Sequence, residues 1–194
     1  DARGALNKEM VSRVAPQIVI ALEDSNKNYP NVYLYNLWLG HMYTFMGEYL
    51  DSTYYELAEE RLFDAWAVNK DRQIVPMLIG KLYFLQGKVD ESIKILQELV
   101  DKDPKYQEPH WLLGLTLVSA DRPEEGIIEL EKGQGWALTT AQNFIYLIDV
   151  YANLEQYDKI PSLYLSLITI EPNNAEYYAR LAAAYVAVED KEKA

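Results

Sequence analysis

The stretch of sequence that decides the fold runs from Asp71 to Lys105 and reads DRQIVPMLIGKLYFLQGKVDESIKILQELVDKDPK. Residues three or four apart share one face of a helix, so its first half predicts a helix with a small residue and an aromatic residue on the same face. A short turn, a second amphipathic helix and a proline stop complete a helical hairpin. The residues that mark these features are Gly80, Tyr83, Gly87, Ser92, Leu96 and Pro104.

The same pattern returns along the chain at a period of 34 residues. The matching residues are Leu113, Gly114 and Leu117, then Leu147, Ile148 and Tyr151, and then Leu181, Ala182 and Tyr185. A strict period of this length is typical of repeat proteins in which each repeat is one helical hairpin. We therefore predict an all-α solenoid of stacked hairpins, and we expect it to act as a scaffold that holds other molecules.

Alignment on this period divides the chain into six predicted segments. Residues 1–30 are predicted to form a degenerate repeat, with one helix before Pro16 and another after it, because proline is disfavoured in a helix interior. The other segments are 31–71, a repeat with six inserted residues, the regular repeats 72–105, 106–139 and 140–173, and 174–194, the first helix of a truncated repeat. Since a solenoid normally ends in a polar capping helix, we expect a fragment of a longer protein.

Two features interrupt the period, and each leaves two interpretations open. The insertion from Glu48 to Ser52 forms either a loop packed on its own repeat or a lip over a binding groove, and Thr53 and Glu56 are spaced as a capping box for the helix that follows. Gly133 and Gly135 either weaken the end of a helix or let a neighbouring helix approach closely.

Composition and charge exclude several classes of protein. With 49% apolar residues over 194 positions the chain can bury a core, but its apolar runs are far shorter than the roughly 20 residues of a membrane span. A net charge of -12 disfavours nucleic acid as a partner. Without cysteine, neither disulfides nor thiolate metal sites can form. We expect a soluble fragment, and the sequence leaves its compartment undetermined.

The repeated residues resemble the tetratricopeptide repeat (TPR). The match rests on the small residue, the aromatic residue, the glycine, the large apolar residue and the proline described above, and it extends over residues 31–194. The resemblance implies a right-handed superhelix of antiparallel helix pairs, whose first helices line a concave groove that binds peptides or other proteins. A fainter resemblance is to the TPR region of bacterial O-antigen ligase and polymerase-like membrane proteins, through the run from Gln107 to Leu115 and the tyrosine-rich insertion. It implies the soluble tail of a membrane glycan enzyme.

Helical spacing predicts which side chains face the groove. Counted from the small residue of each first helix, these are the positions three before it, one after it and about one turn further on. They hold Leu37, His41, Phe45, Met77, Lys81, Phe84, Trp111, Leu115, Ile145 and Asp149. The set is largely apolar, so it either binds a protein or peptide or wedges adjacent repeats together. Asp149 and Glu108 favour a bound peptide that carries positive charge.

No catalytic constellation is predicted. His41 and His110 lie in different repeats, whereas two helical metal ligands need a spacing of three or four residues. Acidic pairs such as Asp90-Glu91 stand at predicted helix starts, where they interact favourably with the helix dipole. We therefore expect no enzymatic activity, no cofactor and no metal.

The tyrosines that recur with the period are expected to pack between helices, with their hydroxyls at the rim. They are Tyr43, Tyr83, Tyr151 and Tyr185. A further alternative is a homo-oligomer, in which the unpaired last helix of one chain and the degenerate first repeat of another complete each other.

Overall fold

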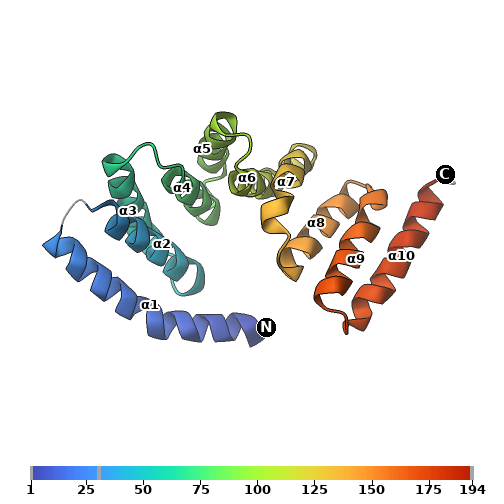
Figure 1. Ribbon diagram of the computed structural model, residues 1–194, viewed down its shortest axis with the longest axis horizontal. Coiled ribbons are helices and arrows are strands. Elements are labelled where there is room, and N and C mark those ends of the chain that lie inside the picture. Colours follow the sequence, from blue (N-terminus) through green and yellow to red (C-terminus); the bar gives the residue numbers. More distant parts are fainter. Residues whose placement is uncertain (1, 30–31, 193–194) are drawn as a thin grey trace. The chain divides into compact units, whose positions relative to one another are not determined.

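The computed structural model describes residues 2–29 and 32–192, and all regular structure in these two ranges is helical (Figure 1). The helices are α1 (Ala2–Asn28), α2 (Tyr33–Tyr49), α3 (Tyr54–Val68), α4 (Ile74–Leu85), α5 (Val89–Lys102), α6 (Gln107–Ser119), α7 (Pro123–Ala137), α8 (Ala141–Asn153), the 3-10 helix η1 (Tyr157–Lys159), α9 (Ile160–Ile170) and α10 (Ala175–Glu192). The all-α prediction is confirmed. No helix in these ranges has both the length and the apolar composition needed to cross a bilayer.

The chain forms two compact units, Asp1–Pro104 and Lys105–Ala194. In the first unit α2 packs on α3 and α4 packs on α5 as helical hairpins, and α1 packs on α2. In the second unit α6 packs on α7, α8 packs on α9, and α10 packs on α9. The division between the units lies one residue from the predicted boundary between repeats 72–105 and 106–139.

The small residue that recurs every 34 residues packs directly against a leucine of the partner helix in the same hairpin. A Cβ atom added to Gly40 would lie 2.6 Å from Cγ of Leu62, and one added to Gly80 would lie 2.7 Å from Cγ of Leu96. Both leucines are fully buried. The glycine therefore lets the two helices of a hairpin approach closely enough to bury the leucine, and this contact returns at Gly114, where an added Cβ would lie 2.6 Å from the buried Leu130.

Helix α1 corrects the prediction of two helices separated at Pro16. It runs without a break from Ala2 to Asn28 with Pro16 in its interior, and Figure 1 shows it bent rather than interrupted. Val11, Ala15 and Val19 recur every fourth residue and are all buried. Burial of this stripe offsets the backbone hydrogen bond that the proline cannot donate.

The capping box predicted at Thr53 and Glu56 is also wrong. Thr53 precedes α3, but it has helical dihedral angles (φ -60°, ψ -24°) and its side chain caps no backbone N–H. Its own N–H instead donates to Oδ1 of Asp51 at 2.8 Å. Glu48 and Tyr49 of the insertion extend α2, and the Tyr49 ring lies 4.8 Å from the Phe45 ring, which agrees with packing on its own repeat.

Three of the recurring tyrosines bind a carboxylate from the preceding second helix. The Tyr43 hydroxyl donates to Glu23 at 3.1 Å, and the Tyr151 hydroxyl donates to Glu131 at 2.9 Å, with a sequence separation of 20 residues in these two cases. Both rings are buried, as predicted. Tyr83 is half-buried, and its hydroxyl donates at 3.3 Å to Glu59.

The packing predicted for Tyr185 is not found, because its side chain is 50% exposed. The position 20 residues before it holds Leu165, which provides no carboxylate for its hydroxyl. The core of the second unit instead lies deeper in the α6 to α9 hairpins, around Leu130, Leu147 and Leu167.

Candidate peptide-binding surface

The first helices of the N-terminal unit, α2 and α4, contact each other and carry six of the predicted groove residues. Five of them, Leu37, His41, Phe45, Lys81 and Phe84, are half-buried. Trp38 belongs to the same surface, since its ring stacks on that of His41 at 6.0 Å with an interplanar angle of 7° and its side chain is 50% exposed. This surface combines exposed aromatic area with polar groups, as protein-binding surfaces do.

The polar groups of this surface are electrostatically linked. Nζ of Lys81 lies 3.9 Å from a carboxylate oxygen of Glu48. Burial lowers the pKa of His41, and the nearby Lys81 ammonium lowers it further. The imidazole is therefore neutral at neutral pH and offers one hydrogen-bond donor and one acceptor.

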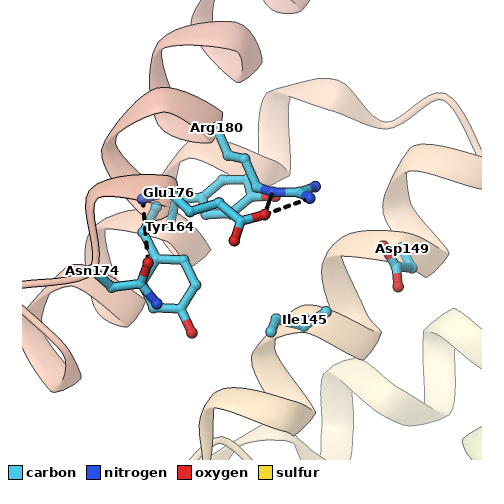
Figure 2. Close-up of a pocket in the computed structure, with 7 residues that line it drawn as sticks. Ile145, Asp149, Tyr164, Asn174, Glu176 and Arg180 are labelled. Atoms are coloured by element: carbon cyan, nitrogen blue, oxygen red, sulfur yellow. Dashed lines mark hydrogen bonds and ion pairs between the residues drawn. The ribbon is translucent and has the colours of Figure 1, made fainter.

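In the C-terminal unit, the first helices α8 and α10 border a pocket of about 320 Å³ (Figure 2). Its wall on α8 consists of Ile145 and Asp149, and Figure 2 shows both facing the side that carries Glu176 and Arg180. The full lining is Ile145, Asp149, Tyr164, Asn174, Glu176, Tyr177 and Arg180. Two residues predicted to line the groove therefore meet at the same pocket.

Most polar groups of the pocket are held by internal bonds. Nε of Arg180 donates to Glu176 at 2.8 Å, and Oδ1 of Asn174 accepts from the backbone N–H of Glu176 at 3.2 Å. The Tyr177 hydroxyl donates to Glu171 at 3.2 Å. These bonds orient one wall of the pocket before any ligand arrives, which lowers the entropy cost of binding.

Asp149 differs from these groups. It is exposed, and no hydrogen bond or ion pair engages its carboxylate among the residues that the structure describes. With Glu176 and Arg180 neutralising each other at 2.7 Å, Asp149 leaves the pocket with one uncompensated negative charge. A cationic side chain of a ligand is the chemical match for this charge.

Two predicted groove residues are not available to a ligand. Met77 and Trp111 are each only 2% exposed. Helix α4 is apolar nearly all round, and its residues 75–80 are all buried. The Trp111 backbone lies against Gly133 of α7 and its ring meets Tyr146 of α8 edge-on at 6.5 Å, so the large side chain wedges helices together.

The remaining predicted residue, Leu115, is half-buried and packs partly on the core of its unit. His110, which was not assigned to the groove, is 3% exposed, and its Nδ1 lies 2.5 Å from Glu129 within the α6 and α7 hairpin. Among the described residues no three His, Asp or Glu side chains are grouped so that they could hold a metal ion.

Sequence reasoning missed Trp38 and most of the pocket wall. Leu34, Trp38, His41 and Phe45 follow the spacing of one helical stripe, and this spacing was the signal that could have identified Trp38. Glu176 and Arg180 are four residues apart, which is a signal for an ion pair on one face of a helix, but this spacing does not show that the pair borders a pocket with Ile145.

In a comparison with known proteins, no family model matches the chain. A segment of it is 33% identical, over 72 residues, to the chloroplastic protein SLOW GREEN 1 of Arabidopsis thaliana, and the match spans 34% of this chain and 23% of that protein. The chain thus covers about a quarter of the length of this relative.

Solved structures cover far more of the chain. The protein pilF of Pseudomonas aeruginosa superposes with a TM-score of 0.71 at 17% identity, over 97% of this chain and 85% of that chain. A TPR protein of Thermus thermophilus gives 0.63 at 15% identity, over 92% and 99%. YrrB, a TPR protein with an unusual peptide-binding site, gives 0.63 at 13% identity, over 89% and 86%. The helical hairpins described above therefore form the tetratricopeptide-repeat fold.

Proposed function

We propose that this protein is a non-catalytic scaffold that binds a peptide or protein segment on the faces of its first helices. The observation that carries the proposal is the pocket between α8 and α10, where Ile145 gives apolar contact and Asp149 presents an unpaired carboxylate. Opposite charge at such a site selects ligands and speeds their association. The segment that fits combines an aliphatic or aromatic residue with Lys or Arg.

The surface of the N-terminal unit supports the same function. Trp38 and Phe45 present the ring types that dominate binding energy in protein interfaces, and His41 between them offers hydrogen bonds. The fold agrees with this proposal, because repeat solenoids expose extended surfaces suited to segments rather than to small substrates.

The test is a selection of 12-residue peptides from a random phage-displayed library on the immobilised whole chain, followed by affinity measurement on the enriched peptides. We expect enriched peptides that pair Lys or Arg with an apolar residue. Asp149→Asn should weaken their binding about tenfold, corresponding to the roughly 1.4 kcal/mol of one charged contact.

The matched control is Glu124→Gln, which removes one exposed carboxylate at the start of α7 in the same unit and outside the pocket. The enriched peptides should bind Glu124→Gln with the same affinity as the unaltered chain. A library without enrichment, or peptides that bind Asp149→Asn and Ile145→Ser as tightly as the unaltered chain, would refute the proposal.

A second candidate function is self-association, and exposed apolar side chains of α10 favour it. Tyr178, Tyr185 and Val186 are between 49% and 58% exposed. Light scattering at rising protein concentration tests this idea, which a constant monomer mass would refute. The role of a tail of a membrane glycan ligase remains a prediction from the resemblance, and the sequence of the surrounding reading frame tests it.

A further inference from the structure

The second helices of the N-terminal unit border a separate cleft of about 280 Å³. Its apolar walls are Phe63 and Trp66 of α3, Tyr83 of α4 and Ile95 of α5. The Phe63 and Trp66 rings lie 6.0 Å apart, tilted by 34°, and Phe63 is 39% exposed. The α3 and α5 helices that form most of this cleft are not the first helices that carry the proposed binding surface.

The edge of the cleft is acidic. Glu91 and Glu98 stand two turns apart on α5, which is about 10 Å along the helix axis. Both are exposed, and neither forms a hydrogen bond or ion pair among the residues that the structure describes. Lys94 lies between them and is the only cation of the lining, so the cleft carries a net negative charge.

The Tyr83 part of the wall is held by a polar cluster. The Tyr83 hydroxyl donates to Glu59 at 3.3 Å, and the Lys88 ammonium binds the same carboxylate at 2.9 Å. The Lys88 ammonium also lies 5.1 Å from the centre of the Tyr83 ring, at a distance typical of a cation–π contact. These contacts orient the Tyr83 ring at the cleft before any partner binds.

A volume of about 280 Å³ accommodates one large aliphatic or aromatic side chain of a partner. The two unpaired carboxylates match basic residues on either side of that side chain, and the Lys94 ammonium matches a backbone carbonyl between them. A second copy of this chain fits poorly, because each copy carries a net charge of -12 and would present an acidic surface to the acidic edge.

We propose that this cleft is a second docking site, for an extended segment of a basic partner protein with one large apolar residue flanked by Arg or Lys. In an extended segment, residues two apart point to the same side, and basic residues four apart span about 13 Å. The sequence Arg-Ser-Leu-Ser-Arg therefore places its leucine in the hollow and its guanidinium groups at the two carboxylates.

The experiment follows the four tryptophan indole N–H signals of the whole ¹⁵N-labelled chain by NMR. The probe is a 12-residue peptide with Arg-Ser-Leu-Ser-Arg at its centre and Gly and Ser elsewhere. Trp66 reports on the cleft, Trp38 on the first-helix surface and Trp136 on α7, and the buried Trp111 reports on general structural change. We expect the Trp66 signal to move and the Trp111 and Trp136 signals to stay, and movement of Trp38 in addition would report binding at the first-helix surface that the proposed function describes.

Two further peptides test the assigned chemistry. Replacing both arginines by glutamate, or the leucine by serine, should weaken binding at least tenfold. In the protein, the double variant Glu91→Gln and Glu98→Gln should also lower affinity at least tenfold. The matched control, Glu56→Gln with Asp71→Asn, removes the same charge at exposed positions of this unit outside the cleft and should bind within twofold of the unaltered chain.

The proposal would be overturned if the Trp66 signal did not move, or if the arginine and glutamate peptides moved it equally. Movement of Trp38 alone assigns the peptide to the first-helix surface, which leaves the proposed function intact and removes this second site. Movement of Trp66 on raising the protein concentration without peptide assigns the cleft to a second copy of the chain.

Discussion

Gly133 is the position where a single added methyl group should destabilise this protein most clearly. A Cβ atom there would lie 2.5 Å from the backbone nitrogen of Trp111 and 2.7 Å from its Cα. Real Cβ atoms do not approach other atoms this closely, and the obstacle is the backbone of α6, which cannot rotate away. In Gly133→Ala, helices α6 and α7 must therefore separate.

The magnitude follows from two opposing terms. Alanine is favoured over glycine inside a helix by about 0.5 to 1 kcal/mol. Overpacking against a rigid neighbour costs about 1 to 3 kcal/mol, and contact with backbone atoms places this site at the upper end of that range. We expect Gly133→Ala to lower the free energy of unfolding by about 2 kcal/mol and the Tm by roughly 4 to 8 °C.

Gly135 provides a matched control in the same helix. An added Cβ there would lie 2.9 Å from Oε1 of Gln107, at the end of a flexible and exposed side chain that can move. Gly135→Ala should therefore leave stability unchanged or raise it by up to about 1 kcal/mol. Urea unfolding followed by circular dichroism at 222 nm measures both variants. Equal changes in the two, or no loss in Gly133→Ala, would refute the packing argument.

The remaining two stability predictions concern buried polar pairs. Burial and the hydrogen bond to Glu23 raise the pKa of Tyr43 to about 12, above the value near 10 expected for the unfolded chain. The neutral hydroxyl therefore contributes stability that is complete below pH 10 and is lost as the pH rises through 12. Tyr43→Phe should lower the free energy of unfolding by about 1 kcal/mol at pH 8. Between pH 10 and 12 the variant should lose less of this free energy than the unaltered chain, as urea titrations at each pH would show. Equal losses in the two proteins would contradict the assignment. His110→Ala should cost about 2 to 3 kcal/mol in thermal unfolding, because it removes the hydrogen bond from His110 to the largely buried Glu129 and leaves that carboxylate with Lys132, at 2.7 Å, as its partner among the described residues. A loss below about 1 kcal/mol would contradict the pairing.

The hairpins were predictable because each depends on contacts between residues close in sequence. The glycine and leucine of a hairpin, such as Gly80 and Leu96, are fixed by the 34-residue period and meet in the structure as the period requires. The continuous α1 was not predictable, since Pro16 is locally unfavourable and only burial of Val11, Ala15 and Val19 against another helix compensates for it.

The candidate site was predicted only in part, for a related reason. Helical spacing identifies which side of a helix a residue occupies, and it placed Ile145 and Asp149 on one side of their helix, where both line one pocket. It does not show whether that side is covered. Trp111 was therefore predicted to be available to a ligand, although Gly133 on α7 lets the two helices approach closely enough to bury it. Arg180 was missed because the spacing of its pair with Glu176 does not show that α8 lies across a pocket from it.

The tyrosine–carboxylate pairs have a consequence for how such arrays evolve. Tyr43 and Tyr151 each depend on a glutamate 20 residues earlier, in the preceding repeat. At the equivalent positions 97 and 117 the sequence holds glutamine and leucine, so the carboxylate and the hydroxyl have both been replaced, whereas the half-exposed Tyr185 keeps its hydroxyl although position 165 holds leucine. A duplicated or transplanted repeat keeps the buried bond only if its new neighbour supplies the matching acid, so the bond belongs to an adjacent pair of repeats rather than to one hairpin.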